Sequence, residues 1–282
     1  MKRWAMNCLG VLLLCWGLAA NALEPRIALV IGNTAYGAKP LRNPANDARA
    51  VAATLRRLGF EVILRENAKL VELLDAFAGF VTRSRPYPVR LVYFAGHGVQ
   101  MKGRNFLLPI DADIRYEDEV RYKGADVGEL LDRLAERRSG LNIIILDACR
   151  NNPYPADLRA VGAGLANMEV PALSLSQRVK IRGTAQGETP QGTLVAYATA
   201  PGAVAYDGEV SNSLYTGALL SHIETPGLPL ELLFKRVRQA VSRQTHEAQI
   251  PWENSSLVGD FCFVSTPDGK CSPEIISSGK VP

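Results

Sequence analysis

The sequence has little of what marks several large classes of protein. It contains no Lys/Arg-rich tract, and its net charge at pH 7 is only +4, so nucleic-acid or membrane-surface binding has little support. It also contains no zinc-ligand spacing, no phosphate-cradling glycine loop and no Gly-x-Ser-x-Gly elbow. We therefore expect neither a nucleic-acid partner nor a required metal or other cofactor.

The composition is that of an ordinary globular protein. Of the 282 residues, 47% are hydrophobic and 21% are charged, and no internal repeat is present. This length and balance allow one large α/β domain or two small ones.

The first 22 residues have the pattern of a secretory signal peptide. Lys2 and Arg3 precede an apolar run over residues 8–20, and the "ANA" that ends at Ala22 fits a small-x-small cleavage site. The run is too short for a comfortable membrane span, although a retained anchor is the alternative. We expect cleavage after Ala22, a periplasmic or secreted location, and no stable membrane insertion of the mature chain.

Export changes how the five cysteines are interpreted. Two of them leave with the signal peptide, and Cys262 and Cys271 then lie nine positions apart across a turn-rich loop. Outside the cytosol a disulfide between these two is plausible, and the sequence alone does not decide whether it forms. Cys149 is left unpaired, either as a reactive thiol or as a small buried hydrophobe.

Strand-like and helix-like segments alternate along much of the chain. Short apolar runs indicate buried strands, and apolar residues at helical spacing, with Asn43-Pro44 as a start and Gly59 as a stop, indicate helices. Near-continuous apolar strands separated by helices predict an α/β fold with a mostly parallel sheet covered on both faces. We expect strands at 26–32, 60–64, 90–95, 141–147, 193–199 and 259–264, a hairpin at 99–108, helices from 44 and at 70–81, 127–134, 214–223 and 229–245, and a long loop at 151–191.

Two of the predicted strands end in residues that can carry chemistry. One apolar run leads into Gly96, His97 and Gly98, and another leads into Asp147 and Cys149. In an open parallel sheet, binding sites form beyond the carboxyl ends of the strands. An imidazole can lower the pKa of a thiol or take its proton, so the two form a nucleophile–base pair if their strands adjoin.

These two stretches resemble a known family. "YFAGHG" and "LDACRNN" are similar to the histidine and cysteine motifs of caspase-like cysteine peptidases, most closely to the bacterial relatives of metacaspases, the orthocaspases. Caspases place the histidine about 50 residues before the cysteine, and here the separation is 52. The resemblance runs from about Arg26 to Val264 and includes "ALVIGNTAY", "LRNPANDA", "NFLLPIDAD" and "AYATAPG".

The resemblance implies a three-layer α/β sandwich with a sheet of about six strands and helices on both faces. It implies a peptidase domain over residues 23–265, with a larger catalytic portion at 23–152, a cleavable linker at 153–192 and a smaller portion at 193–265. Residues 266–282 would form a C-terminal tail.

The resemblance also implies the roles of the residues at the strand ends. Cys149 would be the nucleophile that forms a thioester acyl-enzyme, and His97 would be its acid/base partner. The backbone N–H groups of Gly98 and Cys149 would form the oxyanion hole. The chain departs from metacaspases at two positions, where Arg150 replaces a histidine after the cysteine and Ala95 replaces a serine two residues before His97. Neither departure removes a residue of the dyad.

Two acidic residues predict substrate specificity. Asp147 stands where caspases carry glutamine, as in metacaspases, and Asp47 lies within "LRNPANDA", where metacaspases place a second pocket acid. Two carboxylates at this edge would favour Arg or Lys before the scissile bond over the Asp preferred by caspases. The alternatives are that Asp47 only complements a helix dipole and that Asp147 only bonds the turn after its strand.

Other interpretations stay open. The acidic run Asp111, Asp113, Glu117, Asp118 and Glu119 is most simply a solvated loop, with calcium activation as the alternative. The substrates are expected to be peptides or proteins. A non-proteolytic peptide-binding module of the same fold and a hydrolase of non-peptide amides are the rival functions, and the oligomeric state is not determined by the sequence.

Overall fold

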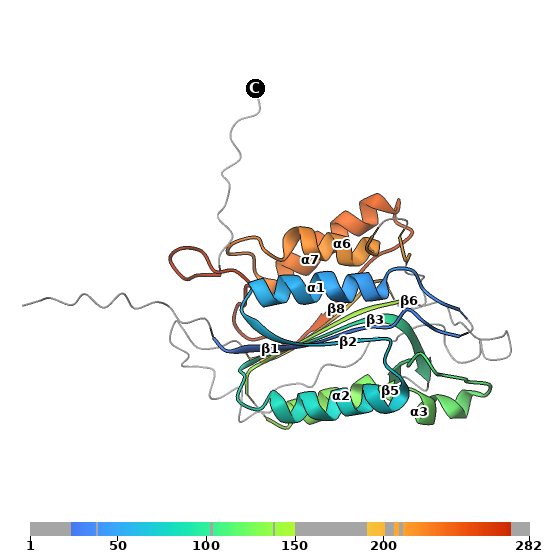
Figure 1. Cartoon of the computed structure of the whole chain (residues 1–282). Helices are drawn as coiled ribbons and strands as arrows, with labels where there is room; N and C mark the ends of the chain where they lie inside the picture. The colour runs from blue at the N-terminus through green and yellow to red at the C-terminus, as the bar shows by residue number, and fades with distance from the viewer. Residues whose placement is uncertain are drawn as a thin grey trace, which may run out of the picture.

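A central sheet with helices on both sides organises the molecule (Figure 1). The computed structural model describes residues 24–37, 39–101, 104–137, 139–149, 191–200, 206–208 and 211–271. The six principal strands lie side by side in the order β2-β1-β3-β6-β7-β8. All adjacent pairs are parallel except β7 and β8. The bounds are β1 Arg26–Gly32, β2 Phe60–Glu66, β3 Val89–Met101, β6 Leu141–Cys149, β7 Gly192–Tyr197 and β8 Trp252–Ser255.

The helices form the two outer layers. Apolar side chains of α1, α6 and α7 pack on one face of the sheet, and those of α2 and α4 pack on the other. No helix in the described ranges is long and apolar enough to cross a membrane. The bounds are α1 Pro44–Arg57, α2 Leu70–Arg83, α4 Val127–Ala135, α6 Leu214–His222 and α7 Leu230–Gln244.

The strands are buried on both faces, and their side chains alternate between the two layers. On β3, Leu91 and Tyr93 belong to the cluster under α1, α6 and α7, whereas Val92 and Phe94 belong to the cluster over α2 and α4. Successive side chains of a strand point to opposite faces, so a strand covered on both sides must be apolar throughout. The predicted three-layer α/β sandwich is confirmed.

A small hairpin extends the sheet near the carboxyl end of β3. Its strands are the end of β3 and β4 (Arg104–Leu107), and β5 (Ala125–Asp126) pairs with β4. A third apolar cluster, which includes Tyr36, Val99 and Phe106, lies beneath it. The predicted hairpin is confirmed, while the short helices η1 (Glu117–Glu119) and α3 (Val120–Lys123) in the acidic run were not predicted.

The last strand differs from the prediction. The segment 259–264 was expected to be a strand, but the structure has no strand there, and the edge strand is β8, Trp252–Ser255. The backbone oxygens of Phe261 and Val264 accept from Leu230 and Gly227, next to α7, rather than from a strand. The phenyl rings of Phe261 and Phe263 are buried against the sheet, so their alternation reflects packing without a ladder.

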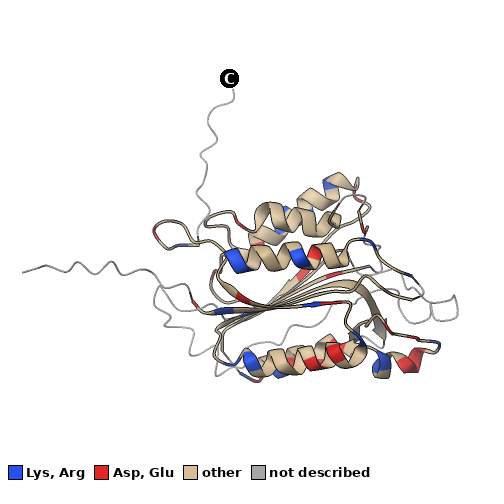
Figure 2. Cartoon of the chain, viewed as in Figure 1, with Lys and Arg blue, Asp and Glu red and all other residues tan. Residues whose placement is uncertain are grey.

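Four charged residues of the described chain are buried, namely Arg26, Asp47, Arg90 and Asp147, and further charged residues occur in both helical layers (Figure 2). Two ion pairs there are partly exposed, Arg57 with Glu224 at 3.1 Å and Arg83 with Glu61 at 2.5 Å. Exposed pairs of this kind contribute about 0–1 kcal/mol each. The apolar clusters on the two faces of the sheet therefore dominate the stability of the fold.

Candidate active site

His97 and Cys149 lie opposite each other on neighbouring strands. They form the last register pair of the parallel strands β3 and β6, so the expectation that their strands adjoin is met. Backbones of adjacent strands are only about 4.8 Å apart, which is within the reach of an imidazole. The backbone of Cys149 is described and its side chain is not.

The imidazole of His97 is held through one nitrogen. Nε2 lies 2.8 Å from the carbonyl oxygen of Lys39, and His97 is 5% exposed. A carbonyl oxygen can only accept, so Nε2 carries the proton of the neutral ring. Nδ1 is buried and accepts from no described residue. The ring therefore keeps an unprotonated nitrogen, Nδ1, on the residue that is in register with the last residue of β6.

The surroundings favour the neutral form of this ring. Burial lowers the pKa of His97, and the hydrogen bond to Lys39 opposes this effect. The positive charge of Lys39 lowers the pKa further, whereas the negative charge of Asp207 raises it. A neutral imidazole is the form that can accept a proton from a thiol.

The backbone N–H of Gly98 points away from the β3–β4 hairpin. Leu108 N donates to His97 O at 2.9 Å, which makes Gly98 and Leu107 a pair that exchanges no hydrogen bonds. His97 N donates to the Tyr36 hydroxyl on that same side. Because the polar groups of successive residues in a strand alternate in direction, Gly98 N–H is directed toward β6 and Cys149.

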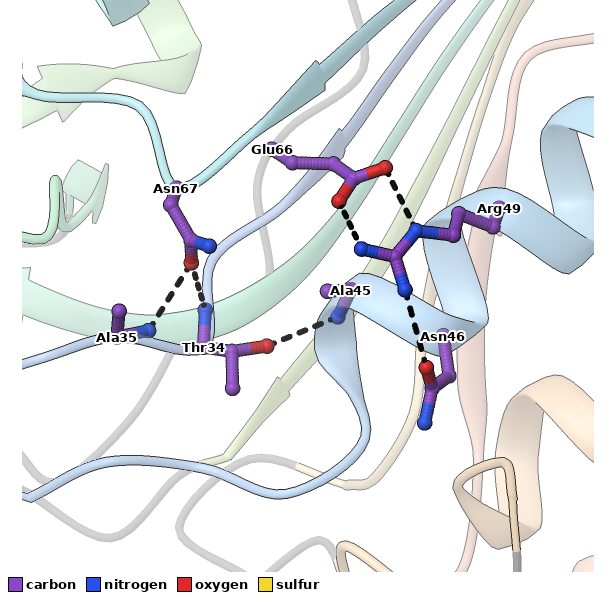
Figure 3. Close-up of polar contacts among 7 residues, drawn as sticks. All are labelled: Thr34, Ala35, Ala45, Asn46, Arg49, Glu66 and Asn67. Atoms are coloured by element: carbon purple, nitrogen blue, oxygen red, sulfur yellow. Dashed lines mark hydrogen bonds and ion pairs between the residues drawn. The ribbon is translucent and has the colours of Figure 1, made fainter.

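The segment after β1, which supplies the Lys39 carbonyl, is anchored at both ends (Figure 3). Asn67 follows β2 with φ of +52°, and its Oδ1 accepts from Thr34 N at 2.9 Å and Ala35 N at 3.0 Å. Thr34 Oγ1 accepts from Ala45 N at 3.0 Å and so caps the start of α1. These bonds fix where the chain passes the edge of the sheet.

Asn43 precedes α1 as predicted, but its side chain does not cap the helix. Its amide instead donates to the backbone oxygens of Asp207 and Gly208, in the loop that follows β7. Thr34 takes over the capping role. The start of α1 is thereby tied to a loop far away in the sequence.

Asp47 and Asp147 are buried and share a partner. Ser213 N donates to Asp47 Oδ1 at 3.0 Å, and Ser213 Oγ donates to Asp147 Oδ2. Asn212 Nδ2 also donates to Asp47 Oδ1 at 2.8 Å, and Thr216 Oγ1 donates to Asp147 Oδ2 at 2.7 Å. The structure thus brings the two predicted acids together at the N-terminus of α6, with each held through one named oxygen.

The ionisation of both acids is unfavourable. Burial and the Asp147 charge raise the pKa of Asp47 to about 8, although the bonds from Asn212 and Ser213 oppose the rise. Burial raises the pKa of Asp147 to about 6, against the bonds from Ser213 and Thr216. The pair therefore resists carrying two negative charges, so a ligand that brings a positive charge would favour full ionisation.

A third acid, Asp207, was missed by the sequence analysis. Its carboxylate accepts from Arg42 N at 2.7 Å and Asn43 N at 3.3 Å, and its charge raises the pKa of both Asp47 and Asp147. It lies in a loop without periodicity, where no pattern separates it from a solvated aspartate. Its position after "AYATAPG" within the resemblance was the only available signal.

The acidic run at 111–119 is occupied by local contacts. Asp111 Oδ1 accepts from Leu70 N at 3.0 Å, Asp113 pairs with Arg115 at 3.0 Å, and Glu119 pairs with Lys123 at 3.0 Å. Among the described residues, no group of three or more His, Cys, Asp or Glu could hold a metal ion. Calcium activation stays an untested prediction.

Cys262 and Cys271 form a disulfide, with their Cα atoms 5.5 Å apart. The predicted signal peptide lies outside the described residues, as do residues 153–190 of the predicted linker and the tail from Ser272, while Gly192 at the end of the predicted linker begins β7. The predicted domain boundaries therefore stay predictions.

His97 and Cys149 form the last register pair of β3 and β6, although β3 itself continues to Met101 in the hairpin, and this arrangement on six principal strands is that expected from the resemblance to caspases. Comparison of the sequence with protein families agrees, since the Caspase domain family matches residues 25–262. The chain belongs to this family, whose members are cysteine peptidases.

Two curated relatives are similar to the chain over part of its length. One is the mouse mucosa-associated lymphoid tissue lymphoma translocation protein 1 homolog, and the other is the human mucosa-associated lymphoid tissue lymphoma translocation protein 1. Each is 32% identical over 133 residues, which is 46% of this chain. The match spans only 16% of each relative, so what those whole proteins do does not transfer to this chain.

Proposed function

We propose that the protein is a cysteine endopeptidase in which Cys149 is the nucleophile and His97 is its acid/base partner. One observation carries the proposal. His97 is the register partner of Cys149, and its Nε2–H donates a hydrogen bond to Lys39 O, so that Nδ1 is left as a proton acceptor. A neutral imidazole held in this tautomer is what a thiol nucleophile requires.

The reaction follows from these roles. Nδ1 of His97 accepts the thiol proton, and the Cys149 sulfur attacks the carbonyl carbon of the scissile peptide bond. The C–N bond then breaks, His97 returns the proton to the leaving amine, and a thioester acyl-enzyme remains. Water, deprotonated by the same nitrogen, hydrolyses the thioester and regenerates the thiol.

The oxyanion of the tetrahedral intermediate would be bound by the backbone N–H groups of Gly98 and Cys149. The assignment rests on the resemblance of "YFAGHG" and "LDACRNN" to the caspase-like motifs. A donor of this kind stabilises charge that develops only in the transition state, and its loss typically costs about 3–4 kcal/mol.

We propose that Asp47 and Asp147 form a pocket for Arg or Lys before the scissile bond, with Asp207 at its edge. All hydrogen bonds to Asp47 from described residues fall on Oδ1, so Oδ2 is available to a ligand. A guanidinium offers a planar fork of donors to such carboxylates. An aspartate side chain would meet like charge instead, with a penalty that reaches several kcal/mol.

We propose that the protein is exported to the periplasm or beyond and needs no cofactor. The signal-like N-terminus supports export, and so does the disulfide between Cys262 and Cys271, because such bonds persist in oxidising compartments. Dependence on calcium is tested by measuring turnover with the ion and with a chelator.

The proposal is tested with a panel of fluorogenic peptides that differ only in the residue before the bond. The wild type should cleave Arg and Lys peptides faster than Asp peptides. Cys149→Ala and His97→Ala should each abolish turnover while the circular dichroism spectrum is unchanged, as expected of groups that act as a unit. Near-normal turnover by purified Cys149→Ala protein would rule out the peptidase, and binding without turnover by the wild type would favour a peptide-binding module.

A further inference from the structure

Tyr36 lies in direct contact with the backbone and the ring of His97. Its hydroxyl accepts from His97 N at 2.9 Å and donates to Leu108 O at 3.1 Å. Its ring centroid is 4.4 Å from that of the imidazole, at an interplanar angle of 53°. Tyr36 is 8% exposed, so these bonds are largely sheltered from water.

The hydroxyl replaces a missing strand partner. The ladder between β1 and β3 ends where Asn33 N donates to Ala95 O, and beyond it β1 offers no acceptor to His97 N. A buried amide without a partner costs free energy comparable to a lost hydrogen bond. Tyr36 supplies that acceptor at the residue on which the chemistry is proposed to depend.

The same contact accounts for the glycine before His97. A Cβ on Gly96 would lie 2.5 Å from the Tyr36 hydroxyl and 2.8 Å from the ring of Phe94, and the φ of Gly96 is +154°. A side chain at this position would therefore displace the tyrosine. Gly96 and Tyr36 depend on each other sterically.

We propose that Tyr36 is a positioning residue, which fixes the backbone at His97 and thereby aims both the imidazole and the adjacent Gly98 N–H at Cys149. The inference rests on the proposed function. His97 is held by its amide at Tyr36, by its oxygen at Leu108 N and by its ring at Lys39 O. Loss of the first contact frees the strand end to shift, and small misplacements of reacting groups cost up to about 100-fold in rate.

The test is Tyr36→Phe, which keeps the ring against the imidazole and removes only the hydroxyl. We expect kcat for an Arg peptide to fall roughly 10- to 100-fold, with KM nearly unchanged because the acid pair lies elsewhere. The pH profile of Cys149 alkylation by iodoacetamide should shift upward, since a misplaced imidazole stabilises the thiolate less. A merely structural role would leave the alkylation profile unchanged, because the molecules that stay folded would keep the wild-type thiol pKa.

Tyr87→Phe is the matched control. It removes a tyrosine hydroxyl that donates to Glu61 at the start of β2, and kcat and alkylation should be unchanged. If Tyr36→Phe does not fold, 4-aminophenylalanine at position 36 keeps the size and a donor for Leu108 O but is a poor acceptor, so a kcat-selective loss is again expected.

Wild-type kcat and an unshifted alkylation profile in either folded variant would overturn the inference. Failure of the proposed function looks different, because the wild type itself would then cleave no peptide. The alkylation profile needs no substrate, so it reports on the Tyr36–His97 contact in either case.

Discussion

Replacement of Asp47 by asparagine should raise the stability of the protein at alkaline pH. Asp47 is 1% exposed, and its pKa is raised from 3.8 to about 8 by burial and by the Asp147 charge. An acid whose pKa is higher in the folded state holds its proton longer when folded, so stability is lost as the pH rises from about 4 to about 8. Asparagine keeps an oxygen for the bonds from Asn212 and Ser213 but carries no charge.

The size of the effect follows from the pKa. Each pKa unit corresponds to about 1.4 kcal/mol, so the rise sets an upper limit of roughly 6 kcal/mol above about pH 8. Relaxation and water penetration reduce such penalties in real proteins. Between about pH 5 and about pH 8.5 we expect the free energy of unfolding of the wild type to fall by about 1–3 kcal/mol relative to Asp47→Asn.

Urea unfolding followed by circular dichroism at both pH values measures the difference. Asp75→Asn is the control, because Asp75 is exposed on α2 and its replacement should leave the pH dependence of the wild type. If the stability difference between Asp47→Asn and the wild type is the same at both pH values, Asp47 ionises without penalty and the reasoning fails.

The same ionisation should appear in ligand binding. In Cys149→Ala protein, an Arg peptide should release protons when it binds, and its Kd should fall with rising pH by up to roughly tenfold per unit near neutrality. A citrulline peptide, which is neutral, should show no such trend. Titration calorimetry in two buffers of different ionisation enthalpy detects the released protons, and an affinity for Arg that is independent of pH would place the ligand elsewhere.

Three further predictions concern the loop after β7, the linker and the disulfide. Asp207→Asn should raise KM for Arg peptides roughly tenfold, about 1.4 kcal/mol of binding, with kcat nearly unchanged; an unchanged KM would remove Asp207 from the pocket. Active protein should cut itself in the linker, which mass spectrometry detects, whereas a fully active intact chain would make processing unnecessary; the candidate sites are Arg159, Arg178, Lys180 and Arg182. Cys271→Ser should cost about 2–3 kcal/mol of stability, the value for closing a short loop, measured by thermal unfolding with and without reductant, and equal melting temperatures would contradict it.

The strands that carry the dyad could be predicted because their burial leaves a clear trace in the sequence. β3 and β6 are covered on both faces, so they appear as near-continuous apolar runs that stop at His97 and Cys149. An apolar run does not indicate which strands are neighbours in the sheet. That β3 and β6 are neighbours was inferred from the fold class, and the register pair confirms it.

The edge of the sheet was predicted wrongly because its pattern is weak. β8 has the sequence "WENS" and is partly exposed, so it lacks the apolar run of a buried strand. The segment "GDFCFV" has a stronger alternation, yet Phe261 and Phe263 are buried by packing near Phe60 and the Arg26 side chain. Periodicity reports burial, and at an edge burial and strand pairing no longer coincide.

Apart from the two pairs that the resemblance implied, contacts between side chains far apart in the sequence could not be predicted. Ser213 was not singled out, although it caps α6, donates its amide to Asp47 and donates its hydroxyl to Asp147. Tyr36 was likewise read only as part of a motif. Such roles depend on which loops meet at the carboxyl edge, and a single sequence contains no signal for that meeting.

The acid pair has a consequence for the proposed cleavage of the linker. Asp47 and Asp147 precede the linker in the chain, whereas Ser213 and Asp207 follow it, so the pocket is assembled from both portions. β6 and β7 also pair across the same boundary over six register positions. A cut in the linker would therefore leave the portions joined by a buried ladder, and separation would destroy the pocket together with the sheet. We therefore expect cleavage to release the two new chain ends of the linker from each other, while the specificity for a cationic residue is retained.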